Sequence, residues 1–193
     1  MSKKFTDLVA LTTPATDDIL PIDDLSASTT KKITVADLLR TTGGLTAQYM
    51  SNPYKFSAYQ SATQNIAASG TAKILLQAEN YDTGSNFDSI TNYRFVAPIT
   101  GFYQFTGSTQ MFVANTVVVQ CFLYKNGVAL REGNTGINAS GGNNNTSSVV
   151  TGSLQLTAGD YIELFTFHSQ ASVAGTVAGS SKTYLDGFLV SAS

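Results

Sequence analysis

Residues that could carry out catalysis are scarce in this chain. Of its 193 residues only one is histidine, His168, and only one is cysteine, Cys121. A Ser-His-Asp triad would have to use His168, which ends the apolar stretch LFTFHSQ with no Gly-x-Ser-x-Gly turn beside it. One histidine and one cysteine are too few for a zinc site. We therefore predict that the protein is not an enzyme, with His168 on the surface or at a strand end and Cys121 buried as a small hydrophobic side chain.

Two carboxylates offer the oxygen ligands that calcium prefers. Asp82 and Asp88 lie in the polar stretch ENYDTGSNFDS, which also supplies amides and carbonyls. The spacing does not fit an EF-hand, so a solvated loop is the alternative to a calcium site, and no other cofactor is indicated. Asp160 and Glu163 occur in a stretch where acidic and apolar residues alternate, which predicts water-facing side chains rather than a glycosidase pair.

A polar segment at residues 133–148, GNTGINASGGNNNTSS, is the candidate ligand loop. Loops on a rigid scaffold often carry recognition, and amide side chains match the hydroxyl groups of sugars. The amides that we single out are Asn138, Asn143, Asn144 and Asn145. The alternative is a low-complexity surface loop without a ligand.

The elements that must position these residues are β-strands. From Tyr54 onward apolar and polar residues alternate, and strands are predicted at 54–59, 72–80, 93–98 and 101–113. A hairpin should turn at Lys125-Asn126-Gly127, because Asn-Gly tolerates positive φ, and a second hairpin should turn at residues 158–160. With a closing strand in TYLDGFLVSA, the pattern gives an all-β antiparallel sandwich of about eight to ten strands.

Aromatic residues gather on both sides of one corner in the run FVAPITGFYQFTG, residues 95–107. Pro98 must end a strand and Gly101 permits a sharp return. The rings fall on both faces of the following strand, which favours one face in the core and the other against another subunit. Two-sided burial within one chain is the alternative. The predicted interface residues are Phe95, Phe102, Tyr103 and Phe105.

The first 45 residues differ in composition from the rest. They hold 11 of the 24 charged residues, so we place an N-terminal arm at 1–45, a linker at 46–53 and a head at 54–193. One short helix is expected after Thr34, which can cap it together with Asp37. A helix this short needs a packing partner, so the arm is predicted to dock on another protein, a flexible tail being the alternative. The apolar residues of the arm are Ile19, Leu20, Ile22, Leu25, Val35, Leu38 and Leu39.

The head resembles a known family through five motifs in order. These are FVAP at 95–98, GFYQF at 101–105, KNG at 125–127, LQLTAGD at 154–160 and DGFL at 186–189. This series is similar to the complement-component-1q type of globular head, a trimeric jelly roll of the tumour-necrosis-factor superfamily. The last motif departs from the family pattern, since Asp186 stands where an aromatic residue is usual. The resemblance covers residues 54–191 and implies a homotrimer; some members bind calcium.

The arm resembles a segment at the start of bacteriophage fibre proteins and other virion-attached proteins. The match covers residues 5–40 and includes LTTPA, DDILPI and TKKITVADLL. It implies that the arm docks on a capsid or tail protein while the head is displayed on the virion surface and binds a host-surface glycan or protein. Alternatives are a purely structural capsid-decoration or tail-junction protein, a depolymerase, and a cellular adhesin or secreted signalling head.

Charge and hydropathy narrow the partners further. The net charge of −2 argues against nucleic acid, and no run of about 20 apolar residues suggests membrane insertion. The first residues lack the apolar stretch of a signal peptide, so we expect synthesis in the host cytoplasm before assembly on the virion.

Overall fold

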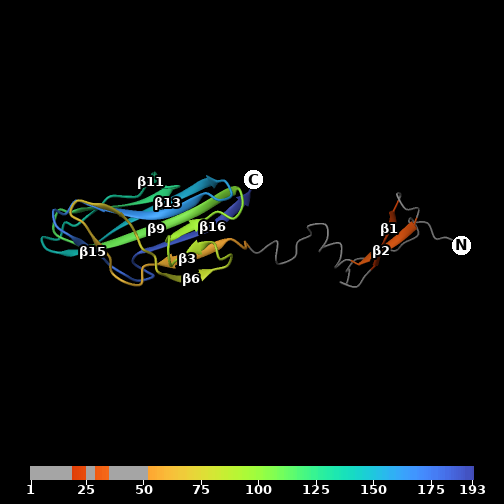
Figure 1. Cartoon of the computed structure of the whole chain (residues 1–193), viewed down its shortest axis with the longest axis horizontal. Coiled ribbons are helices and arrows are strands. Elements are labelled where there is room, and N and C mark those ends of the chain that lie inside the picture. The colour runs from red at the N-terminus through yellow and green to blue at the C-terminus, as the bar shows by residue number, and fades with distance from the viewer. Residues whose placement is uncertain (1–18, 25–28, 35–51) are drawn as a thin grey trace. The chain divides into compact units, whose positions relative to one another are not determined.

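The computed structural model describes residues 19–24, 29–34 and 52–193 (Figure 1). The chain divides into two compact units, Met1–Ser51 and Asn52–Ser193. The described residues form strands and turns but no helix, and therefore no helix that could cross a membrane. The helix expected after Thr34 falls outside the described residues, as do Leu25, Val35, Leu38 and Leu39.

The first unit contains a two-stranded hairpin. Strand β1, Ile19–Asp24, pairs antiparallel with β2, Thr29–Thr34, in a register that joins Ile19 to Thr34 and Asp24 to Thr29. Pro21 is tolerated in β1 because both strands of a two-stranded sheet are edges, where a missing N–H need not break a ladder. Three of the apolar arm residues, Ile19, Leu20 and Ile22, lie on β1.

The second unit, the head, is a sandwich of two antiparallel sheets (Figure 1). In sheet I the long strand β9 lies between β13 on one side and β16 and β15 on the other, and β3, β6 and β4 complete it. In sheet II the order is β11-β10-β14-β8-β7, with β12 paired to β10 and β5 paired to β14. The sheet I strands are β3 Lys55–Tyr59, β4 Asn65–Ile66, β6 Ala78–Asp82, β9 Gly101–Val113, β13 Asn144–Leu156, β15 Ala174–Thr176 and β16 Tyr184–Ala192. The sheet II strands are β5 Thr71–Lys73, β7 Phe87–Asp88, β8 Arg94–Val96, β10 Val118–Lys125, β11 Val128–Glu132, β12 Gly136–Ile137 and β14 Tyr161–His168.

The predicted all-β antiparallel sandwich is confirmed, and eight strands of the head have five residues or more. The Asn-Gly hairpin is also confirmed: Asn126 and Gly127 adopt φ values of 52° and 79° between β10 and β11. Both residues take the left-handed region because a two-residue turn must match the twist of its strands.

Two predicted elements were wrong in the same way. The segment at 158–160 does not close a hairpin, because β13 belongs to sheet I and β14 to sheet II. Residues 72–80 are not one strand, because β5 pairs with β14 and β6 pairs with β3 in the other sheet. In both places the chain crosses between sheets, and an alternating pattern contains no information about which sheet each strand joins.

Aromatic rings fill one end of the core. Phe56 stacks on Phe87 and Phe95 with ring centroids 5.0 and 4.8 Å apart, and Phe95 lies 5.7 Å from Phe105. The Tyr103 hydroxyl donates to the Ile99 carbonyl across the corner at 2.8 Å. These rings come from both sheets, so the cluster holds the two layers together.

This core corrects the predicted subunit interface. Phe95, Tyr103 and Phe105 are at most 1% exposed within their own chain, and only Phe102 faces outward, with 42% of its surface exposed. The alternative of burial within one chain therefore describes three of the four rings. Because inner and outer positions alternate along β9, Tyr103 and Phe105 share the core face and Phe102 takes the other.

The opposite end of the core is aliphatic. It consists of Ile66, Met111, Val113, Val117, Val119 and Ala174. Between the two clusters a buried hydrogen bond joins Thr109 of sheet I to Thr166 of sheet II at 3.1 Å. Cys121 is fully buried nearby, and this confirms its predicted role as a small core residue.

Close packing around Gly187 gives the first prediction. A Cβ at this position would lie 2.6 Å from a Phe56 ring carbon and 2.7 Å from a Phe105 ring carbon. We expect Gly187→Ala to lower the free energy of unfolding by roughly 1–3 kcal/mol, measured by denaturant unfolding at fixed protein concentration. Gly142→Ala is the control, because nothing lies within 4 Å of its added Cβ. Equal stability of the two variants would contradict the aromatic core.

Candidate functional site

The candidate calcium carboxylates are engaged by their own loop. Asp82 accepts hydrogen bonds from the backbone N–H groups of Gly84 and Phe87 at 3.2 and 2.7 Å. Asp88 accepts from the N–H groups of Ile90, Thr91 and Asn92, and from the Asn92 side chain, at 2.7–3.1 Å. These bonds lower the pKa of Asp88 to about 2, the Thr91 N–H making the largest contribution. Both side chains shape turns, as the solvated-loop alternative requires.

Within the described residues no three His, Cys, Asp or Glu side chains come together as a metal site would need. A cavity of about 390 Å³ does lie beside the two carboxylates, with Glu79 in its wall. The hydrogen bonds of Asp82 and Asp88 point into the loop backbone, so their roles are explained by the loop itself.

Asp160 and Glu163, the other candidate carboxylates, lie in two different environments. Asp160 holds the β10–β11 turn by accepting from Lys125 Nζ at 2.8 Å and Asn126 Nδ2 at 2.7 Å. Glu163 was predicted to face water but is only 6% exposed, because Lys73 covers it in an ion pair of 3.0 Å. The pKa of Asp160 is lowered to about 2, and its hydrogen bond from Lys125 is the main cause.

His168 and Cys121 lie in the core rather than at a reactive surface. His168 ends β14, as predicted, but it is fully buried rather than on the surface, and its Nδ1 accepts from the Gln170 N–H at 3.2 Å. Burial raises the pKa of the Cys121 thiol to about 11, so the thiolate that nucleophilic chemistry needs is disfavoured.

The Asn-rich segment is not one continuous loop. Asn144 and Asn145 belong to β13, and Asn138 is 3% exposed with its amide bonded to the backbone. Asn143 alone of the four lines a cavity, at the end of the sandwich beyond the last residues of β9. The structure therefore does not bring the four amides together, because Asn144 and Asn145 belong to a strand and Asn138 is buried in a turn.

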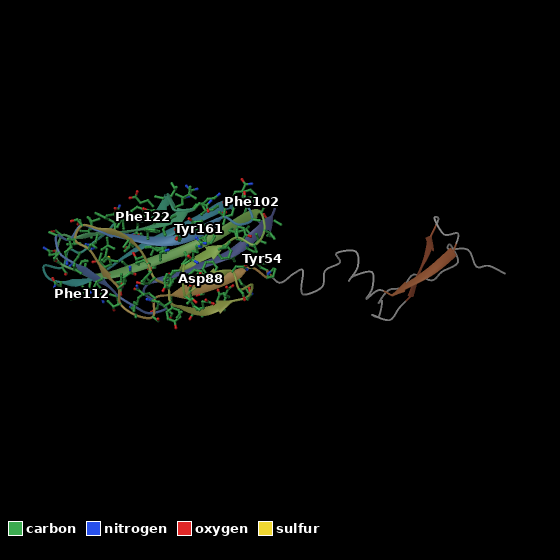
Figure 2. The ribbon with its side chains drawn as sticks, in the orientation of Figure 1. Tyr54, Asp88, Phe102, Phe112, Phe122 and Tyr161 are labelled. Atoms are coloured by element: carbon green, nitrogen blue, oxygen red, sulfur yellow. The ribbon has the colours of Figure 1, made fainter. Side chains whose placement is uncertain are left out.

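The outward face of sheet I carries several large apolar side chains that are exposed to solvent. These side chains come from the adjacent strands β13, β9 and β16, and Figure 2 shows Phe102 and Phe112 near the two ends of the head. We call this surface the apolar face; it consists of Phe102, Phe112, Val149, Phe188 and Val190, each 42–57% exposed.

The apolar face is almost free of charge. Between its apolar side chains lie uncharged polar residues, among them Gln104, Thr106 and Thr151. The one charged residue at an outward position of β9, β13 and β16 is Asp186, which the register places between Thr106 and Ser57. Depletion of charge around exposed aromatic rings is typical of the centre of a protein–protein interface.

Asp186 is partly buried, and no other charged residue lies at an outward position of β9, β13 or β16 to pair with it. One of its oxygens is buried without a hydrogen-bond partner in the described structure. Burial raises the pKa of Asp186, and a hydrogen bond from Ser57 opposes that rise only in part. Asp186, which departs from the family motif, is thus also a carboxyl group of the apolar face with one oxygen buried and unpartnered in the described structure.

Sequence reasoning identified Phe102 but missed the other members of the apolar face. The sequence did contain a signal for Phe112. It follows Phe102 by an even number of residues, so both side chains lie on the same face of β9. The sequence did not reveal that β9 pairs with β13 and β16. This pairing places Val149 and Phe188 on the same face of sheet I as Phe102 and Phe112.

Acid titration tests the role of Asp88. Because its pKa in the folded protein lies below the ordinary value of an aspartate, 3.8, its stabilising effect is complete above about pH 4 and is lost as the pH falls towards 2. We expect Asp88→Ala to lower the free energy of unfolding by about 1 kcal/mol at neutral pH. Measured by thermal unfolding, the gap between variant and parent should close towards pH 2, whereas a constant gap would contradict this role.

Comparison with known proteins supports the fold of the head. The chain is similar to Eiger TNF from S. frugiperda, with a TM-score of 0.57 and 10% identity over 72% of this chain and 94% of that one. It is similar to the globular domain of zebrafish complement 1qA, with a TM-score of 0.51 and 14% identity over 72% and 99%. It is also similar to murine APRIL, with a TM-score of 0.52 and 14% identity over 70% and 99%.

No protein-family model and no curated protein sequence matches the chain. At identities of 10–14% the solved structures establish a fold and nothing more. The head is therefore a jelly roll of the kind found in tumour-necrosis-factor and complement-1q domains, and the predicted resemblance is confirmed at the level of fold.

Proposed function

We propose that this protein is a non-enzymatic, homotrimeric recognition head whose N-terminal arm attaches it to a larger particle. The observation that carries the proposal is the apolar face. A soluble sheet normally presents polar residues on the side that meets water, yet here five exposed rings and aliphatic side chains stand among uncharged polar residues on the outer side of three adjacent strands. Partner copies that cover this face would remove it from water.

The jelly-roll fold favours a trimer over other assemblies. Complement-1q-type heads, which the motifs resemble, assemble as trimers, and the apolar face lies on β9, β13 and β16 of sheet I. Self-association would also account for the scarcity of charged residues on the apolar face, because each buried charge would need a partner once water is excluded.

Attachment to a bacteriophage particle rests on the sequence pattern of residues 5–40. That pattern places the arm on a capsid or tail protein and the head on the virion surface, where it meets the host. The separate compact unit Met1–Ser51 is compatible with an arm that has its own partner. Many copies on one particle would raise the avidity of a weak single site.

Polar substitution of the apolar face tests the trimer. The full-length chain has a mass of 20.4 kDa, and we expect light scattering to give three times this value. Phe102→Ser combined with Phe188→Ser should shift the protein to monomer, because two half-exposed rings leave the interface. Val128→Ser is the matched control, since Val128 is 69% exposed on β11 of the other sheet. A monomeric parent protein would refute the proposal.

The pH dependence of assembly tests Asp186. Its raised pKa means that ionisation costs more in the folded protein than in an unfolded chain, and covering the face increases that cost. The trimer should therefore be most stable at pH values where Asp186 is protonated and weaken as the pH rises through its raised pKa. Analytical ultracentrifugation across this range should show the trend in the parent and its loss in Asp186→Asn. A trimer that tightens with rising pH would contradict burial of Asp186.

A further inference from the structure

Three loops border an open cavity at the end of the head that lies far from where the chain enters it. The loops are 114–117 after β9, 138–143 before β13 and 169–173 after β14. Strand β9 spans 13 residues, so roughly 40 Å separate its two ends. Figure 2 places Tyr54 near the beginning of β9 and Phe112 near its far end. We call the space between the three loops the tip cavity; its volume is about 490 Å³.

Asn138 joins the first two loops. Its backbone carbonyl accepts from the Thr116 N–H at 2.7 Å, and its N–H donates to the Val117 carbonyl at 3.1 Å. Its buried amide donates to the carbonyls of Val113 and Gly142 at 2.8 and 2.7 Å. The Asn-rich turn is therefore fixed to the end of β9 rather than free.

Gln170 joins the third loop to the first. Its side-chain oxygen accepts from the Ala114 N–H at 2.9 Å, and its side-chain nitrogen donates to Ser172 Oγ and the Val173 carbonyl, both at 3.1 Å. Its backbone N–H donates to the buried His168. The walls of the cavity are thus held in place before any ligand arrives, which lowers the entropic cost of binding.

The lining of the tip cavity combines hydrogen-bonding groups with small apolar side chains and contains no ionisable residue. The polar members are Thr116, Asn143, Ser169, Gln170 and Ser172, and the apolar members are Ala114, Val117 and Ala171. Asn143 is exposed, and its side chain makes no hydrogen bond to any other described residue. Its amide can therefore offer both a donor and an acceptor to a ligand.

We infer that the tip cavity is a binding site for a neutral carbohydrate, and this inference rests on the proposed recognition function. The Asn143 amide can both donate to and accept from sugar hydroxyls, while the C–H surface of a sugar ring can contact Ala114, Val117 and Ala171. The volume of about 490 Å³ falls within the range of small-ligand pockets, roughly 300–1,000 Å³.

Other ligand classes fit this lining less well. A phosphate, sulfate or sialic acid would bring a charge that no lining side chain neutralises. A hard cation such as calcium would find no carboxylate among the lining residues. A lipid chain would find only three small apolar side chains, Ala114, Val117 and Ala171, in a lining whose other members are polar.

A glycan-binding experiment on the full-length chain tests the inference. The protein is applied to a printed panel of neutral oligosaccharides of hexoses and N-acetylhexosamines, beside sialylated and sulfated versions of the same chains. We expect binding to neutral members and no gain from the anionic groups. Isothermal titration with the best-bound soluble member should then show affinity reduced about tenfold or more in Asn143→Asp and in Ala171→Leu, which alter the cavity in different ways.

Asn65→Asp is the matched control, because it makes the same chemical change on an exposed asparagine that does not line the cavity. Binding to no member of the panel, to anionic members only, or with equal affinity in the parent and both cavity variants would overturn the inference. Light scattering on the same samples tests the trimer separately. A monomer that binds neutral glycans through the cavity would contradict the proposed trimer and leave the carbohydrate site standing.

Discussion

Alternation along β9 is the constraint on which the rest of the head depends. The strand runs the length of the sandwich, pairs with β13 on one side and with β16 and β15 on the other, and places every second side chain in the core. Its inward residues, including Tyr103, Phe105 and Met111, contribute to both core clusters. Its outward residues Phe102 and Phe112 belong to the apolar face. A shift of the β9 register by one residue would turn its inward side chains outward and its outward side chains inward, so the same register determines both the core and the exposed face.

The sequence was most informative where structure is decided locally. The Asn126-Gly127 turn follows from the positive φ that those two residues tolerate, and the corner at Pro98 follows from its missing N–H. The overall sandwich follows from period-two alternation over many short segments. These features need no knowledge of distant neighbours, and the structure reproduces them.

The features that the sequence did not predict depend on contacts between distant segments. Tyr103 and Phe105 are core residues because rings from β3 and β8 surround them, which their own neighbours in sequence do not reveal. Glu163 is buried only because Lys73, 90 residues earlier, covers it. Asn138 appears in a polar run yet is buried, since its amide satisfies the backbone of a turn that has no other partner. The candidate sites were misjudged for the same reason.

The pairing of β16 between β3 and β9 has a consequence for biosynthesis. Residues 184–188 bridge the first strand of the head to its central strand, so sheet I remains in two pieces until they are in place. These residues are synthesised after the other described strands of the head, and pairing across such a separation is slow to form. A nascent chain therefore cannot complete the surface bearing Phe188 before residues 184–188 have been made. A chain that stops before Tyr184 would leave β3 and β9 unjoined in sheet I.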